Sequence, residues 1–111
     1  METNEIPEKQ PQPWQPITKK GDIAALGKLG EELGELIAIK ERILIQGLDG
    51  INPDNNKPNK QALLEETADV IAMIAIISDR FELDTLQVDV RIKGKISFTS
   101  SWISILDTQE V

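Results

Sequence analysis

The run of residues 70–77 contains only apolar residues, and it lies in the middle of a longer segment with helical periodicity. A helix that lacks a polar face must be buried on all sides. One chain of 111 residues offers few other short helices to cover such a segment. We therefore expect a helical protein that assembles as an oligomer.

Apolar residues recur at three- to four-residue spacing in two long segments, at about residues 22–46 and about residues 59–80. Asn59 is the expected N-cap of the second segment. Asp84 and Gln87 have the spacing of a capping box for a third helix. Gly94 indicates a break or kink, after which a weaker helical pattern continues. Because no run shows the alternation of a strand, the sequence predicts an all-α bundle of about four helices.

The N-terminal stretch reads as a tail followed by one domain. Prolines interrupt residues 1–16, which favours an extended or polyproline conformation. We expect residues 17–111 to form a single helical domain. Trp14 has two interpretations. We favour its packing onto the body of the protein or onto a partner subunit over its serving as a ligand for another domain.

Two acidic clusters lie within the expected helices, at residues 31–35 and 65–69. Each cluster contains a carboxylate pair three residues apart, Glu32 with Glu35 and Glu66 with Asp69. Residues at this spacing are neighbours on a helix surface. At about 100° per residue, Glu66 and Asp69 fall on the stripe that should face the core. Burial of a lone carboxylate is strongly unfavourable, so these residues need a partner.

A cation is the simplest partner for the four carboxylates. Lys28 lies one turn before Glu32 and could pair with it, but no basic residue lies one turn from both Glu66 and Asp69. The chain has no histidine and no cysteine, so only oxygen ligands are on offer. Such ligands suit Mg²⁺, with Mn²⁺ as an alternative. The pattern therefore indicates a magnesium-dependent enzyme that acts on phosphates.

The composition excludes several other classes of protein. A net charge of −7 argues against a nucleic-acid-binding surface, although a bound divalent ion would let an acidic pocket accept a nucleotide. The absence of cysteine and histidine excludes disulfides, thiolate zinc sites and histidine-based triads. The N-terminus lacks the pattern of a signal peptide, and no apolar run is long enough to cross a membrane. We expect a soluble, cytoplasmic protein.

The two motifs resemble those of the MazG-like, all-α nucleotide pyrophosphohydrolase family. The family pattern is E-E-x-x-E on one helix, here Glu31, Glu32 and Glu35, and E-x-x-D on the next, here Glu66 and Asp69. The surroundings also look similar, at residues 28–30, 46–47, 57–59 and 69–70. The resemblance covers about residues 20–84 and is to the small members found in phages and prophages.

The resemblance implies a helical bundle that forms a homodimer or homotetramer. It also implies hydrolysis of a nucleoside or deoxynucleoside triphosphate to the monophosphate and pyrophosphate. By position, the four carboxylates of the two pairs would be the metal ligands. The catalytic residues would be Glu31, Glu32 and Glu35. Of these, Glu31 would support the metal ligands or orient water. Basic residues of the last helix would contact the phosphates, and the ones in the right region are Arg91, Lys93 and Lys95.

Two other functions stay open from the sequence. The chain could be a non-catalytic helical oligomer, a phage-encoded protein that binds a host partner through its apolar second helix and its tail. It could also be a nucleotide sensor that binds a nucleotide without hydrolysing it. Magnesium-dependent release of pyrophosphate separates the enzyme from both.

Overall fold

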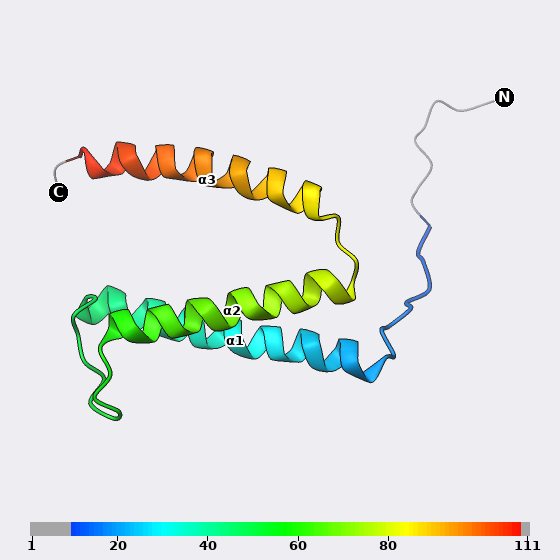
Figure 1. Ribbon diagram of the computed structural model, residues 1–111, viewed down its shortest axis with the longest axis horizontal. Coiled ribbons are helices and arrows are strands. Elements are labelled where there is room, and N and C mark those ends of the chain that lie inside the picture. The colour runs from blue at the N-terminus through cyan, green and yellow to red at the C-terminus, as the bar shows by residue number, and fades with distance from the viewer. Residues whose placement is uncertain (1–9, 110–111) are drawn as a thin grey trace.

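A computed structural model of the chain describes residues 10–109, so residues 1–9 of the expected tail and residues 110–111 of the expected domain lie outside it. Three α-helices follow one another (Figure 1): α1 (Lys20–Gln46), α2 (Asn59–Arg80) and α3 (Thr85–Asp107). Across the described residues no strand forms, and one isolated bridge joins Ile51 to Pro58. The predicted all-α class is confirmed.

The third helix runs without interruption through Gly94, where the sequence indicated a break. The expected count of four helices is therefore not confirmed. At its start, the carboxylate of Asp84 accepts a hydrogen bond of 3.0 Å from the backbone N–H of Gln87, which confirms the predicted cap. The Gln87 side chain donates to the other Asp84 oxygen at 3.3 Å and so reinforces this helix end.

The first two helices pack along each other in opposite directions. Arg80 at the end of α2 forms an ion pair of 2.8 Å with Asp22 in the first turn of α1, which fixes the register of the pair. Ala25, Ile39 and Val70 are the buried apolar residues of this contact. The same interface also buries a carboxylate, that of Glu32.

The connection between α1 and α2 is held by Asn59, whose role differs from the predicted one. Asn59 is the first residue of α2, not its N-cap, and it is completely buried. Its side-chain amide donates to the Gly47 carbonyl at 3.0 Å and to Gln46 Oε1 at 3.2 Å. Its backbone N–H donates to the Gly50 carbonyl at 2.8 Å. Asn59 therefore ties the start of α2 to the end of α1 and fixes the loop between them.

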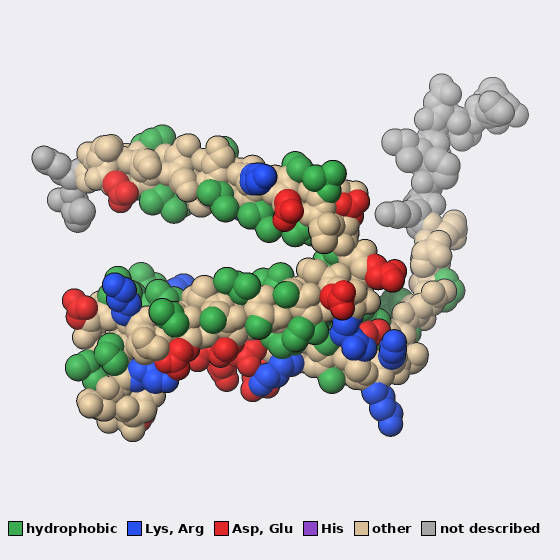
Figure 2. All heavy atoms as spheres, in the orientation of Figure 1, with side chains coloured by type: hydrophobic (Ala, Val, Ile, Leu, Met, Phe, Trp, Pro, Cys, Tyr) green, Lys and Arg blue, Asp and Glu red, His purple; other side chains and the backbone are tan. Residues whose placement is uncertain are grey.

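The third helix lies apart from the α1–α2 pair, and none of its residues is buried. Apolar side chains on α2 and α3 face the open space between them (Figure 2). In the segment 70–77 only Val70 is buried, while Ile71 is 61% exposed and Ile74 is 47% exposed. The expected all-round burial of this segment is therefore not achieved within one chain.

The described part of the tail, residues 10–16, contains no helix, and neither do residues 17–19, the start of the expected domain, before α1 begins at Lys20. Trp14 is 93% exposed, so the expectation that it packs onto the body of its own chain is wrong. Its packing onto a partner subunit and its role as a ligand stay predictions. None of the three helices combines the length and the apolar content that crossing a bilayer requires.

Candidate metal centre

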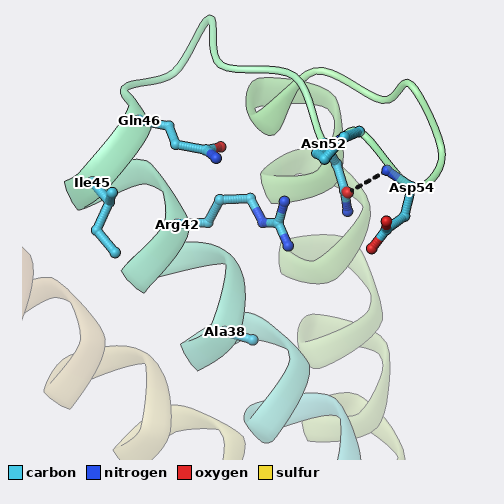
Figure 3. Close-up of a pocket in the computed structure, with 7 residues that line it drawn as sticks. Ala38, Arg42, Ile45, Gln46, Asn52 and Asp54 are labelled. Carbon is cyan, nitrogen blue, oxygen red and sulfur yellow. Dashed lines mark hydrogen bonds between the residues drawn. The ribbon is translucent and has the colours of Figure 1, made fainter.

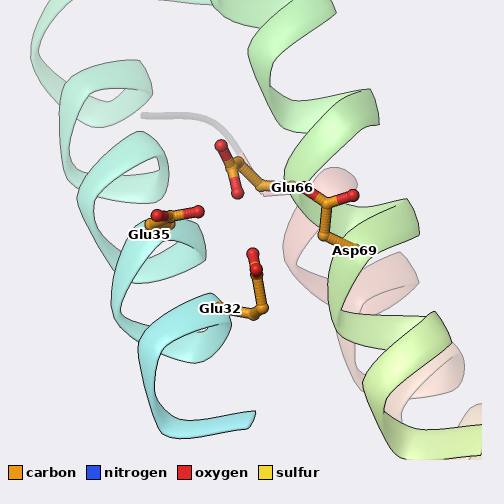
Figure 4. A group of neighbouring side chains, drawn as sticks. All are labelled: Glu32, Glu35, Glu66 and Asp69. Atoms are coloured by element: carbon orange, nitrogen blue, oxygen red, sulfur yellow. The ribbon is translucent and has the colours of Figure 1, made fainter. Parts of the chain in front are cut away.

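The two predicted carboxylate pairs face each other across the α1–α2 contact. Glu32 and Glu35 project from adjacent turns of α1, and Glu66 and Asp69 project from adjacent turns of α2 (Figure 4). Each residue offers one carboxylate oxygen, and the four oxygens all lie within 4.8 Å of one another. The two helices thus bring together two acidic pairs that are more than thirty residues apart in sequence.

Burial of part of this cluster is costly without a counter-charge. Glu32 is only 7% exposed and Glu66 is half-buried, whereas Glu35 and Asp69 are exposed, so the expectation that Asp69 faces the core is wrong. The Oε2 atoms of both residues are buried and accept no hydrogen bond from any described residue. A buried acceptor without a partner costs about 1–3 kcal/mol, and more when it is charged. The two unpartnered oxygens therefore point to a ligand between the helices.

Lys28 forms ion pairs with part of the acidic cluster, as its spacing from Glu32 predicted. Its Nζ lies 3.2 Å from Glu32 Oε1 and 3.2 Å from Glu31 Oε1. Glu32 and then Glu31 raise the pKa of Lys28 above its ordinary value, so it stays charged. This lysine orients Glu31 beside the cluster, yet it leaves the second oxygen of Glu32 free.

The crowding of the carboxylates also changes the acidity of Glu35. The nearby carboxylates of Glu66 and then Glu32 raise the pKa of Glu35 to about 7, from an ordinary value of 4.5. The larger cause is hydrogen bonding of the protonated Glu35 carboxyl to these two carboxylates, and repulsion between like charges at short range adds to it. A bound cation would oppose this effect and favour the ionised form of Glu35.

The donor set fits a small divalent ion. Mg²⁺ binds oxygen ligands at about 2.1 Å, so ligands on opposite sides of the ion lie roughly 4.2 Å apart. The four oxygens all lie within 4.8 Å of one another, so they gather in a space of about the size of one coordination sphere. With no histidine or cysteine in the chain, the ligands are of the hard type that Mg²⁺ and Mn²⁺ prefer. The cluster can therefore hold one of these ions, whose identity the oxygens alone do not select.

An open cavity of about 260 Å³ adjoins the carboxylates, between α1, the loop and the start of α2. Glu35 and Glu66 form one side of it, and Arg42 and Lys57 also line it. Lys57 is already paired with Glu65 at 2.7 Å, which raises the pKa of Lys57 and, together with Gln61, lowers that of Glu65. Arg42 was not among the site residues predicted from the sequence. Its position two turns after Glu35, on the same face of α1, was the signal that could have identified it.

The basic residues expected against the phosphates lie elsewhere in the single chain. Arg91, Lys93 and Lys95 are all on α3, and Arg91 and Lys95 line a shallow hollow of that helix. None of the three lines the cavity beside the carboxylates. One chain therefore brings together the predicted metal ligands and Glu31 but not the predicted phosphate contacts.

Comparison with known proteins gives no relative: no protein-family model, curated protein or solved structure matches the chain. Membership of the MazG-like family is therefore still an expectation from the two sequence motifs.

Proposed function

We propose that the protein is a magnesium-dependent nucleoside triphosphate pyrophosphohydrolase of the MazG-like type. It would convert a nucleoside or deoxynucleoside triphosphate to the monophosphate and pyrophosphate. The observation that carries the proposal is the meeting of four carboxylates from two helices, with a buried and unpartnered oxygen on Glu32 and another on Glu66. The choice of the bond that is cleaved, between the α- and β-phosphates, comes from the motif resemblance and not from the geometry.

Glu32, Glu35, Glu66 and Asp69 would hold the ion, with Mg²⁺ preferred and Mn²⁺ as a substitute. When bound, such an ion neutralises phosphate oxygens and stabilises the charge that develops during hydrolysis. The rigid placement of the ligands on two packed helices means that little reorganisation is needed for binding. Figure 4 shows the side chains already directed toward the space between α1 and α2.

The remaining chemistry falls to carboxylates and lysines, because the chain has no histidine. Glu31 is held beside Glu32 through their shared contact with Lys28, at the edge of the cluster. It would orient a water molecule for attack on the α-phosphorus and accept its proton. The water oxygen would form a bond to that phosphorus as the bond to the bridging oxygen breaks. That oxygen would then leave with the pyrophosphate.

The complete bundle would form between copies of the chain. α3 and the apolar segment of α2 are uncovered in one chain, and a homodimer or homotetramer would bury them. Such an assembly would also add helices to the three of one chain. Arg91, Lys93 and Lys95 of a second copy would then be available to contact the leaving pyrophosphate.

Release of pyrophosphate from the eight common ribo- and deoxyribonucleoside triphosphates, with and without Mg²⁺, tests the proposal. We expect magnesium-dependent release from at least one of them. Glu66→Gln and Asp69→Asn should abolish it, since each removes a ligand charge. The matched control is Glu41→Gln, because Glu41 is an exposed residue of α1 that pairs with Lys40 outside the cluster. Nucleotide binding without any turnover would instead identify a sensor. The absence of both nucleotide binding and turnover would favour a non-catalytic oligomer.

A further inference from the structure

The cavity beside the carboxylates continues toward the loop between α1 and α2. A second hollow of about 340 Å³ adjoins the first and shares Ala38, Arg42 and Asn52 with it. We refer to the two adjoining hollows together as the groove, whose lining includes Glu35 in the first hollow and Asp54 in the second. The groove extends the candidate site away from the metal ligands, so it is where the rest of a bound nucleotide would lie.

The loop presents hydrogen-bond donors to this groove. Asn52 Oδ1 accepts a hydrogen bond of 2.9 Å from the backbone N–H of Asp54 (Figure 3), and Asn55 Oδ1 accepts one of 3.0 Å from that of Lys57. These bonds fix which end of each amide is the oxygen, because only an oxygen can accept from a backbone N–H. Among residues 10–109, the amide nitrogens of Asn52 and Asn55 donate no hydrogen bond, so both are available to a ligand.

Arg42 adds a charged donor. Its side chain extends from α1 into the space between this helix and the loop (Figure 3). It is half-buried, and within the described residues it forms no ion pair and no hydrogen bond. A half-buried guanidinium with five unused donors favours a ligand that supplies acceptors.

The spacing and the apolar lining identify the part of the ligand that fits. Arg42 lies seven residues after Glu35, which is about 10.5 Å along a helix. This separation is enough to span a sugar between the phosphate at the carboxylates and a base at Arg42. Ala38, Ile39 and Ala62 line the groove on the way. An apolar wall with a few convergent donors suits a planar base better than a phosphate chain.

We propose that this groove binds the nucleobase of the substrate and selects a base with carbonyl acceptors, guanine above all. The proposal rests on the nucleotide function proposed above. Guanine presents O6 and N7 side by side, and the arginine fork binds both at once. Adenine places an amino donor where guanine has O6, so it would oppose the donors of Arg42, Asn52 and Asn55.

Two variants at one position separate base recognition from phosphate binding. Arg42→Ala removes both the charge and the fork, whereas Arg42→Lys keeps the charge and loses the fork. We expect each variant to lose roughly ten- to a hundredfold in kcat/KM for the guanine nucleotide and to change little for the adenine nucleotide. The control is Lys40→Ala, which removes an exposed cation of the same helix that is paired with Glu41.

Calorimetric titration of GMP and AMP in the presence of Mg²⁺ gives a readout that does not need turnover. The parent should bind GMP at least tenfold more tightly than AMP, and Arg42→Ala should remove that difference. The proposal is overturned if Arg42→Lys retains the parent's kcat/KM, if the loss is equal for all bases, or if neither monophosphate binds. Absence of pyrophosphate release with Arg42-dependent GMP binding would refute the hydrolase function alone and leave the base site standing.

Discussion

Glu35 on α1 faces Glu66 on α2, and this proximity, reinforced by Glu32, raises the pKa of Glu35 to about 7. The pair of helices therefore holds a proton near neutral pH when no cation is bound. The same carboxylate would lose that proton when a divalent ion enters the cluster. Proton binding and metal binding at Glu35 are thus alternatives, and this relationship has consequences that can be measured.

The first prediction concerns the pH dependence of stability without metal. The pKa of Glu35 is about 7 in the folded protein and near 4.5 in the unfolded chain. The folded state binds this proton more tightly, so its contribution to stability is complete below pH 4.5 and is lost as pH rises through 7. Thermal unfolding in the presence of a chelator should show a falling Tm over this range.

Glu35→Gln is the matched variant for this measurement, because glutamine resembles the protonated carboxyl at every pH. Its Tm should fall less than that of the parent between pH 4.5 and pH 7.5. Parallel curves for the two proteins would show that Glu35 has an ordinary pKa.

The second prediction concerns the metal ligands. Loss of a residue that supports a ligand commonly weakens metal affinity by roughly 10–100-fold, so loss of a ligand should cost at least as much. We expect Glu66→Gln and Asp69→Asn to weaken Mn²⁺ binding by that amount in a calorimetric titration. Glu41→Gln, outside the cluster, should bind like the parent. If Glu66→Gln and Asp69→Asn bind Mn²⁺ as tightly as the parent, Glu66 and Asp69 are not metal ligands.

Much of this site was predictable from the sequence because it depends on local rules. Carboxylates three residues apart share a helix face, so each pair could be recognised from its spacing, and Glu66 could be placed on the stripe expected to pack against the other helix. The cap of α3 followed from Asp84 in the same way. The predicted contact of Lys28 with Glu32 also needed only the spacing of one helical turn.

The features that sequence analysis missed depend on tertiary structure. Asn59 reads as an N-cap, but its side chain binds the end of α1, since a buried amide there satisfies the Gly47 carbonyl. Gly94 reads as a break, yet the helix continues through it. Arg42 becomes a candidate site residue only because the loop folds back beside α1 and places Asn52 near it. No local rule gives the path of that loop.

The third prediction tests the tight connection at Asn59. A methyl group on Gly50 would lie 2.7 Å from Gln46 Cβ and 2.9 Å from Asn59 Nδ2, which is closer than real contacts allow. Gly50→Ala should therefore reduce the free energy of unfolding by about 1–3 kcal/mol. Urea titration measures the change.

Gly27→Ala is the control for this substitution, since a methyl group on Gly27 would meet nothing within 4 Å. Alanine favours a helix interior by up to about 1 kcal/mol over glycine, so this variant should be as stable as the parent or more so. If Gly27→Ala is the more damaging of the two, a partner helix packs closely against Gly27.

The fourth prediction concerns assembly. α3 has no buried residue, and a helix gains most of its stability from packing on a neighbour. We expect sedimentation at micromolar concentration to show a dimer or tetramer. Ile74→Glu, at a side chain 47% exposed in one chain, should dissociate it, while Lys19→Glu outside the apolar surface should not. A folded monomer of the parent protein would contradict the proposed assembly.

The most direct test of the central claim is hydrolysis in oxygen-18 water in the presence of Mg²⁺. Attack on the α-phosphorus puts the label into the nucleoside monophosphate and leaves the pyrophosphate unlabelled, which is the result we predict. The label is read by mass spectrometry of the two products, using whichever triphosphate releases pyrophosphate fastest. Label in the pyrophosphate would place the attack on the β-phosphorus, and release of orthophosphate with a nucleoside diphosphate would contradict the proposed reaction.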